Sequence, residues 1–120
     1  MNKICTNYEQ SKKLQELGLD PDTADMAWYD SYAESGHSFR ILNKEYPLSI
    51  IGEEHDEVPA WSLGALFTLT PHISLSGCDH GLPYICSYSD DDISRHFTYG
   101  NDPIDAVYEM IAHLLRNKNL

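Results

Sequence analysis

Three residues that lie close together in the chain have side chains that bind zinc. Cys78, His80 and Cys86 fall within nine residues, and Asp79 adjoins them. Zinc sites usually consist of two closely spaced ligand pairs, and here only Cys78 and His80 form such a pair. Cys5 would complete a set of four ligands if the fold brought it near. Without that fourth ligand these are ordinary small cysteines of a reduced protein, and we expect no metal site.

Nucleophilic catalysis needs a nucleophile, a base and a group that orients the base. The chain has three cysteines and six histidines, but none lies in a recognisable context such as a Gly-x-Ser-x-Gly elbow. His113 lies beside the apolar stripe of a predicted helix, where histidine is usually a boundary residue. We therefore expect no catalytic residue and no cofactor. The alternative is a small enzyme or metal-binding domain that uses Cys78, His80 and nearby acids.

Two acidic runs are the candidates for an interaction surface. The first contains Glu53, Glu54, Asp56 and Glu57, and the second consists of Asp90, Asp91 and Asp92. The second run lacks the alternating ligands and the glycine of an EF-hand loop, so it does not indicate a specific calcium site. Runs of this kind are usually solvated loops. If both lie on one face, however, they would form a negative patch that docks a basic protein.

The charge balance of the whole chain supports such a patch. Nineteen acidic residues against eight lysines and arginines give a net charge of −11. Residues 20 to 105 hold sixteen of the acids, and their only bases are Arg40, Lys44 and Arg95. A body this negative repels nucleic acid backbones and anionic membrane surfaces, so we expect neither as a direct partner. A protein with a basic surface is favoured; the alternative is an acidic surface that only aids solubility.

Length and cysteine usage indicate the general class of the protein. A chain of 120 residues predicts a single globular domain over 1 to 120. An odd number of cysteines without paired spacing argues against a disulfide framework. The first residues have no apolar h-region, and no apolar run approaches the ~20 residues that span a bilayer. We therefore expect a cytoplasmic protein.

The first part of the chain predicts a helix followed by a β-hairpin. Thr6 and Glu9 fit a capping box at the start of the helix, and Gly18 is well placed just past its end. Residues 26 to 32 and 37 to 42 are rich in large and strand-favouring side chains, which predicts two paired strands. Trp28 and Trp61 lie at apolar positions of their elements, and we expect both in the core.

Two further helices are predicted in the second part of the chain. Pro59 suits the first turn of a short helix in which Leu63, Leu66 and Phe67 form a buried face. A last helix begins near Pro103. Its broad apolar stripe consists of Val107, Met110, Ile111, Leu114 and Leu115.

The remaining strands complete the predicted fold. Residues 82 to 88 and 93 to 99 predict a second pair, and 73 to 76 suit a shorter fifth strand. The short connections between paired strands favour antiparallel pairing. The order α-β-β-α-β-β-α therefore predicts an α+β fold, in which three helices cover one antiparallel sheet of four or five strands.

Five segments of the chain, 5 to 18, 24 to 28, 59 to 66, 81 to 83 and 106 to 115, carry a resemblance to known sequences. The resemblance is most specific in the segment that begins Pro59-Ala60-Trp61-Ser62-Leu63. In these segments the chain resembles a family of small acidic hypothetical proteins carried by phages and integrated mobile elements of gut bacteria. The family has no assigned activity, so the resemblance implies a genomic setting and transfers no site.

Charge and resemblance together favour a non-enzymatic interaction protein, encoded by a phage or mobile element, that binds a basic protein through an acidic face. One version is a nucleic acid mimic, whose carboxylates occupy a groove meant for phosphates. This hypothesis requires carboxylates from distant parts of the chain to converge on one face. An even scatter of acids among the bases would remove its physical basis.

Overall fold

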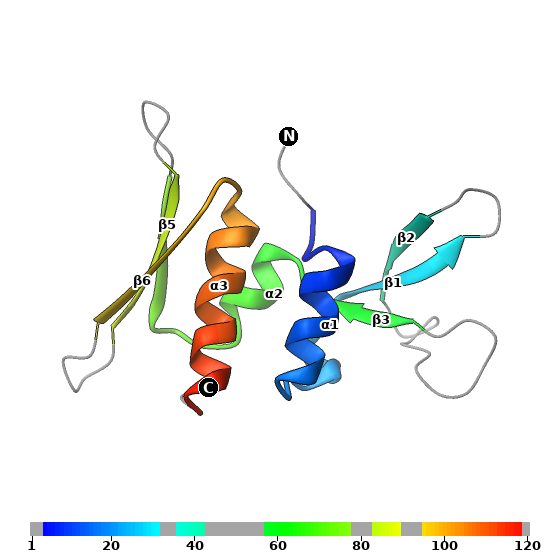
Figure 1. Cartoon of the computed structure of the whole chain (residues 1–120), viewed down its shortest axis with the longest axis horizontal. Helices are drawn as coiled ribbons and strands as arrows, with labels where there is room; N and C mark the ends of the chain where they lie inside the picture. The colour runs from blue at the N-terminus through cyan, green and yellow to red at the C-terminus, as the bar shows by residue number, and fades with distance from the viewer. Residues whose placement is uncertain (1–3, 32–35, 43–56, 78–82, 90–94, 119–120) are drawn as a thin grey trace.

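The computed structural model describes residues 4–31, 36–42, 57–77, 83–89 and 95–118 of the chain. These ranges hold three α-helices and six β-strands. The helices α1 (Tyr8–Glu16), α2 (Leu63–Phe67) and α3 (Pro103–Arg116) lie side by side, and a three-stranded antiparallel sheet flanks them at each end of the long axis (Figure 1). The architecture is therefore α+β, as the sequence predicts, with the helices between the sheets.

Helix α1 begins one residue later than the sequence pattern indicates. Asn7, rather than Thr6, is the N-cap: its side chain accepts a hydrogen bond from the Gln10 N–H (2.7 Å), and the Gln10 side chain accepts one from the Asn7 N–H (3.0 Å). The capping box is thus present but does not involve Glu9. Gly18 has a φ of +98°, which glycine adopts without strain, so its predicted place after the helix is confirmed.

The first sheet contains the predicted hairpin and one additional strand. Strands β1 (Met26–Ser31), β2 (Gly36–Ile41) and β3 (Val58–Ala60) pair in the order β2-β1-β3. The hairpin β1–β2 confirms the strands predicted over 26 to 32 and 37 to 42, within the described residues. The third strand was not predicted, because the sequence around it suggests the start of a helix.

Pro59 lies in strand β3 rather than in the first turn of a helix, contrary to the prediction. It pairs with Ala27 of β1, and proline is tolerated there because β3 lies at the edge of the sheet formed by the described strands. Helix α2 begins only after Ser62, whose side chain caps it. Asp25 holds this cap in place, since its carboxylate accepts hydrogen bonds from the Ser62 N–H (2.9 Å) and hydroxyl.

The second sheet consists of β4 (Ile73–Ser76), β5 (Tyr84–Ser89) and β6 (Arg95–Gly100) in the order β4-β5-β6. It contains the predicted second pair and the short strand at 73 to 76. Gly100 lies where the chain turns from β6 into α3, and a Cβ atom there would lie 2.5 Å from the backbone nitrogen of Ala106. Only glycine fits this close approach of strand and helix.

The described strands form two sheets, which corrects the prediction of one sheet with four or five strands. The reason is the breadth of the buried surface of α3. At ~100° per residue its buried side chains extend over roughly 240° of the helix circumference, far more than the ~100° stripe of a surface helix. One side of α3 contacts β5 and β6, while another contacts α2 and α1, so the helix separates the sheets. The buried residues are Ile104, Ala106, Val107, Met110, Ile111, Ala112 and Leu114.

The core is divided into two apolar clusters of unequal size. The main cluster surrounds α3 and includes Trp61, which is fully buried and whose indole N–H donates to the Thr23 hydroxyl (2.9 Å). The small cluster consists of Cys5, Met26 and Ala60. Trp28 packs against it half-buried, and its indole N–H donates to the carbonyl of Thr6 (2.8 Å). The predicted core position is therefore confirmed for Trp61, while Trp28 lies at the edge of the small cluster.

Candidate docking surface

Alternating side chains give β6 one packed face and one open face. His96 and Thr98 point toward α3: the His96 ring stacks on that of His113, and the Thr98 hydroxyl donates to the carbonyl of Ala106 (2.7 Å). Because successive side chains of a strand point to opposite sides, Arg95, Phe97 and Tyr99 point away from the helix. All three are exposed.

The neighbouring strands extend this open face across the whole sheet. On β5, Cys86 and Tyr88 are buried in the main cluster, which turns the intervening residues outward. The strand register places Ser76, Ile85 and Tyr99 in one row across the sheet, and Ser74, Ser87 and Phe97 in the next. We define the outer sheet face by these six residues together with Ser89 and Arg95, which form a third row.

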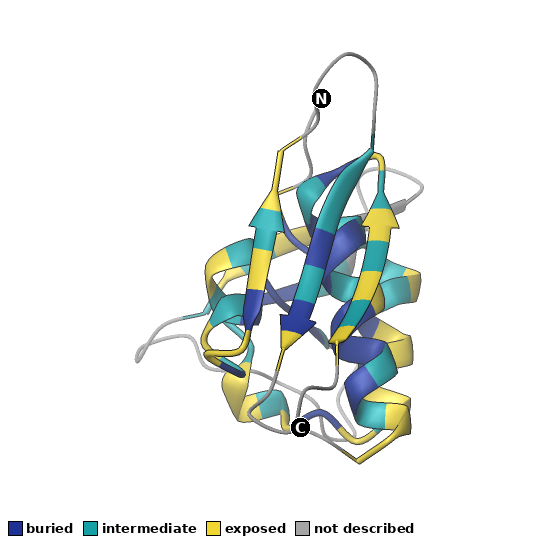
Figure 2. Ribbon diagram, turned by 90° about the vertical axis from the view of Figure 1, so that its left-hand side faces the viewer, coloured by how far each residue is buried: buried dark blue, intermediate teal, exposed yellow. Residues whose placement is uncertain are grey.

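The two aromatic residues make this face unusual for a solvated surface. The side chains of Phe97 and Tyr99 are 50% and 56% exposed. Figure 2 shows the sheet in front view, with the helices behind it and no described element in front. Adjacent exposed apolar side chains on one face mark interaction sites more often than single ones do.

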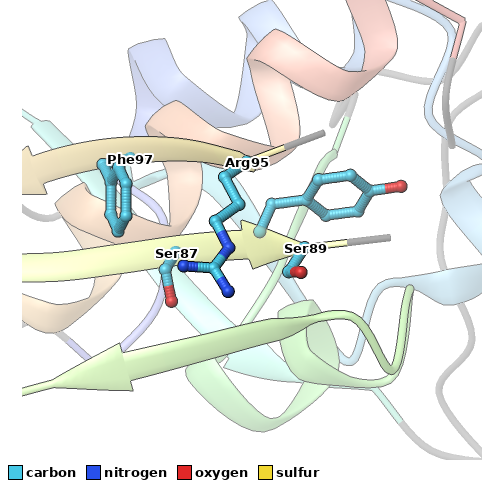
Figure 3. Close-up of a pocket in the computed structure, with 5 residues that line it drawn as sticks. Ser87, Ser89, Arg95 and Phe97 are labelled. Carbon is cyan, nitrogen blue, oxygen red and sulfur yellow. The ribbon is translucent and has the colours of Figure 1, made fainter. Parts of the chain in front are cut away.

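A shallow pocket lies beside Phe97 at the end of the face. Its lining includes Ser87, Ser89, Arg95 and Phe97, and its volume is about 140 Å³. Figure 3 shows the guanidinium of Arg95 extending over β5 between the two serines. Sites for drug-sized ligands and cofactors are usually ~300–1,000 Å³, so this pocket has room for only one small chemical group.

Most of the acidic residues predicted to form an interaction surface lie outside the described ranges. These are Glu53, Glu54, Asp56, Asp90, Asp91 and Asp92. Their convergence on one face therefore stays a prediction.

Glu57, the remaining member of the first acidic run, lies inside the protein. It is only 8% exposed, and its carboxylate accepts two hydrogen bonds from Arg40, at 2.5 Å to Nε and 2.6 Å to Nη2. The hydrogen bond to Glu57 raises the pKa of the Arg40 guanidinium. Glu57 directly precedes β3 and Arg40 lies on β2, so the pair joins the two strands that flank β1. This residue is a structural ion-pair partner rather than part of a solvated patch.

Other described acids also serve the fold rather than an acidic face. Asp102 caps α3 by accepting from the Ile104 N–H (2.9 Å), and Asp105 accepts from the Gln10 side chain (2.8 Å). On α1, two lysines separate Glu9 from Glu16. The part of the chain that the structure describes therefore offers more support for the outer sheet face than for an acidic one.

The described cysteines do not support the zinc hypothesis. Cys5 lies in the small cluster and Cys86 in the main one, so they belong to different parts of the core. Burial raises the pKa of each thiol to about 11, with a further contribution from Asp25 at Cys5, so both are protonated at neutral pH. No group of three or more metal-binding side chains is found among the described residues. Cys78 and His80 lie outside them.

Comparison with known proteins adds no assignment. No family model, curated protein or solved structure matches this chain. The resemblance to phage and mobile-element proteins thus remains a prediction. Within the described ranges, no helix has the length and apolar character needed to cross a membrane.

The sequence pattern predicts part of the outer sheet face, but it does not predict that this face is exposed. The alternation along 93 to 99 already places Arg95, Phe97 and Tyr99 on one side of a strand. It does not tell which side the helices cover, because both sides carry aromatic or polar residues. The useful signal is the pair of small polar residues opposite them, Ser87 and Ser89, which would be unusual on a face buried in a core.

Proposed function

We propose that this protein is a non-enzymatic interaction protein that binds a basic protein partner through the outer sheet face. The observation that supports it is the pair Phe97 and Tyr99, half-exposed on a sheet whose other face is packed on α3. Aromatic residues and arginine are enriched among the few residues that dominate binding energy at protein interfaces. A rigid sheet presents them without the entropic cost of ordering a loop.

The expected basic character of the partner follows from the net charge of −11. A negative field speeds the encounter with a positive protein and makes the association rate depend on salt. The run Asp90 to Asp92 lies in the chain segment that connects β5 to β6, the two strands that supply the pocket. In this proposal the acids steer the partner, and the aromatic side chains provide the short-range contact.

The predicted genomic setting makes a host or viral protein the expected partner. Nucleic acid mimicry is the less favoured version, because a mimic binds through carboxylates. The only charged residue of the outer sheet face is Arg95. Exposed aromatic anchors suit a protein surface better than a groove that binds phosphates.

The test is a pull-down from host lysate. It compares the proteins captured by the wild-type protein with those captured by a Phe97→Thr, Tyr99→Thr double variant. Threonine favours strands, so we expect the fold to persist and the free energy of unfolding to change by less than about 1 kcal/mol. The matched control is Ile41→Thr, at an apolar residue of β2 in the other sheet that is 70% exposed. We expect a specific partner to be lost with the double variant, retained with the control, and released as salt rises.

Equal capture by the double variant and the control would show that the outer sheet face is not the docking surface. If the amount of captured partner does not change with salt concentration, the electrostatic part of the proposal is wrong. Circular dichroism of each variant separates a lost contact from a lost fold.

A further inference from the structure

Arg95 is a single positive charge on an otherwise neutral face of an acidic protein. Of the eight residues of the outer sheet face, it alone is ionised at neutral pH. Among the described residues, no carboxylate forms an ion pair with it. A guanidinium has five N–H donors and no acceptor, and the hydroxyl of Ser89 can donate as well. The Ser87 hydroxyl is hydrogen-bonded to that of Ser74 (2.7 Å), and it can donate to a ligand when Ser74 is the donor of that pair. The group that fits this pocket is therefore an acceptor, and an anion is preferred.

The pocket has room for one small anion, and charge favours a carboxylate over a phosphate. About 140 Å³ is enough for either group, but a phosphate carries up to two negative charges and is repelled more strongly by this acidic protein. The planar fork of an arginine matches the two oxygens of a carboxylate in a bidentate contact, which a single amide carbonyl cannot reproduce. Since the net charge of −11 disfavours free anions, the carboxylate must arrive attached to something that binds nearby.

Phe97 provides that second contact at a defined distance. Arg95 and Phe97 are two residues apart on the same side of β6. Their Cα atoms are therefore about 7 Å apart, at ~3.4 Å per residue. A C-terminal amino acid carries a carboxylate and a side chain on the same Cα atom, so one residue spans both contacts. An internal aspartate or glutamate would need a second residue to supply the apolar group.

We propose that the pocket beside Arg95 binds the C-terminal carboxylate of the protein partner, while Phe97 contacts the side chain of the partner's last residue. This inference rests on the proposed function and specifies which part of the partner docks. It agrees with a basic partner, because lysines or arginines upstream of the C-terminus meet the negative field while Arg95 neutralises the one terminal carboxylate.

The test is an NMR titration of the full-length, ¹⁵N-labelled protein with two short peptides. Each has an acetylated N-terminus, two lysines, a glycine and a final phenylalanine; one ends in a free carboxylate and the other in a carboxamide. We expect the carboxylate form to shift the amide signals of Ser87, Ser89 and Phe97 in a saturable way. Its affinity should exceed that of the carboxamide by roughly tenfold, as for one charge-assisted contact.

Two substitutions of Arg95 test whether the preference for the carboxylate peptide over the carboxamide peptide depends on this arginine. In Arg95→Gln the carboxylate peptide should bind no better than the carboxamide. In Arg95→Lys part of the preference should survive, because the charge remains without the fork. Lys13→Gln on α1 is the matched control: it removes one positive charge from an exposed residue elsewhere and should retain the full preference.

Equal affinity of the two peptides, or equal behaviour of Arg95→Gln and Lys13→Gln, would overturn the inference. So would the absence of saturable shifts with either peptide. A carboxamide peptide with aspartate before the final phenylalanine that binds as tightly as the carboxylate form would overturn the assignment to a C-terminus. Capture that depends on Phe97 and Tyr99 would still support the docking surface in each of these cases, so the two proposals fail separately.

Discussion

The two sheets of this protein are attached to the helices by different kinds of interaction. The β4–β5–β6 sheet packs on α3, where Met110 and Ile111 are fully buried in the main cluster. In the described chain, the β2–β1–β3 sheet has the small cluster beneath it. Two directional contacts supplement that cluster: the hydrogen bond from Trp28 to the Thr6 carbonyl ties the sheet to the segment before α1, and the ion pair of Arg40 with Glu57 ties β2 to β3 within the sheet.

This difference explains why the β4–β5–β6 sheet can present a docking surface. Apolar burial is non-directional and roughly proportional to the area removed from water, so one broad contact with α3 holds β5 and β6 without using their outer side chains. The other sheet also exposes apolar side chains, Phe39 and Ile41 of β2, but Phe39 packs edge-on against Trp28, with ring centroids 5.2 Å apart, and so takes part in the packing of that sheet. Aromatic residues can therefore be exposed on the β4–β5–β6 sheet with little consequence for the fold.

The largest effect on stability is expected for a substitution in the main cluster, and it tests the contrast between the two sheets. Ile111→Ala should lower the free energy of unfolding by about 2–5 kcal/mol, because it removes buried methylene and methyl groups and leaves a cavity. Urea denaturation measures this change. Ile41→Ala is the matched control, since the same atoms are removed from a side chain that is 70% exposed, and it should cost less than about 1 kcal/mol. Similar losses for the two variants would contradict the assignment of the core to α3.

A smaller effect is expected when the ion pair of the other sheet is broken. Glu57→Gln keeps the shape of the side chain but removes its charge, and should cost about 1–3 kcal/mol because Arg40 loses its bidentate acceptor. Hydrogen exchange should accelerate at the β1 amides of Met26 to Trp28 and remain slow in β5. Glu16→Gln on the exposed side of α1 serves as the control. Equal acceleration in both sheets would show that the pair does not act locally.

The smallest effect concerns the stacked histidines between β6 and α3. The rings of His96 and His113 lie 3.7 Å apart and nearly parallel. Burial, His96 and Arg116 lower the pKa of His113. The unfolded chain, with a histidine pKa near 6.5, therefore binds the proton more readily than the folded protein. The contribution of His113 to stability is complete above about pH 6.5 and is lost as the pH falls below it.

The comparison of wild type with His113→Gln isolates this contribution from the carboxylates that titrate in the same range. Urea denaturation at pH 7.5 and 5.5 should show the wild type losing stability relative to the variant on acidification. A relative gain at the lower pH would mean that the folded protein favours the protonated ring, and would contradict the lowered pKa.

Elements with a local signal were predicted well from the sequence. The apolar stripe and the proline at its start define α3, and Gly18 ends α1 where its left-handed conformation is needed. The sequence pattern places Pro59 in the wrong element, because the pairing partner that makes it a strand residue, Ala27, lies 32 positions away. The division into two sheets depends on how many sides of α3 are covered, which the stripe alone does not reveal.

The candidate site shows the same limit. Pairing of Arg40 with Glu57 and stacking of His96 on His113 each join residues seventeen positions apart, and no sequence spacing predicts such contacts. The alternation of Arg95, Phe97 and Tyr99 was visible, but the open side of their strand is determined by the packing of α3. Local patterns therefore predicted the residues of the outer sheet face, while tertiary packing decides that they are exposed.

The positions of the two tryptophans have a practical consequence. Trp61 is enclosed in the main cluster and Trp28 lies half-buried against the small one, so each apolar cluster contains its own natural fluorophore. Emission from the enclosed indole should be blue-shifted relative to that of the partly hydrated one. Loosening of either half of the molecule thus has a separate optical signature, readable without any attached dye.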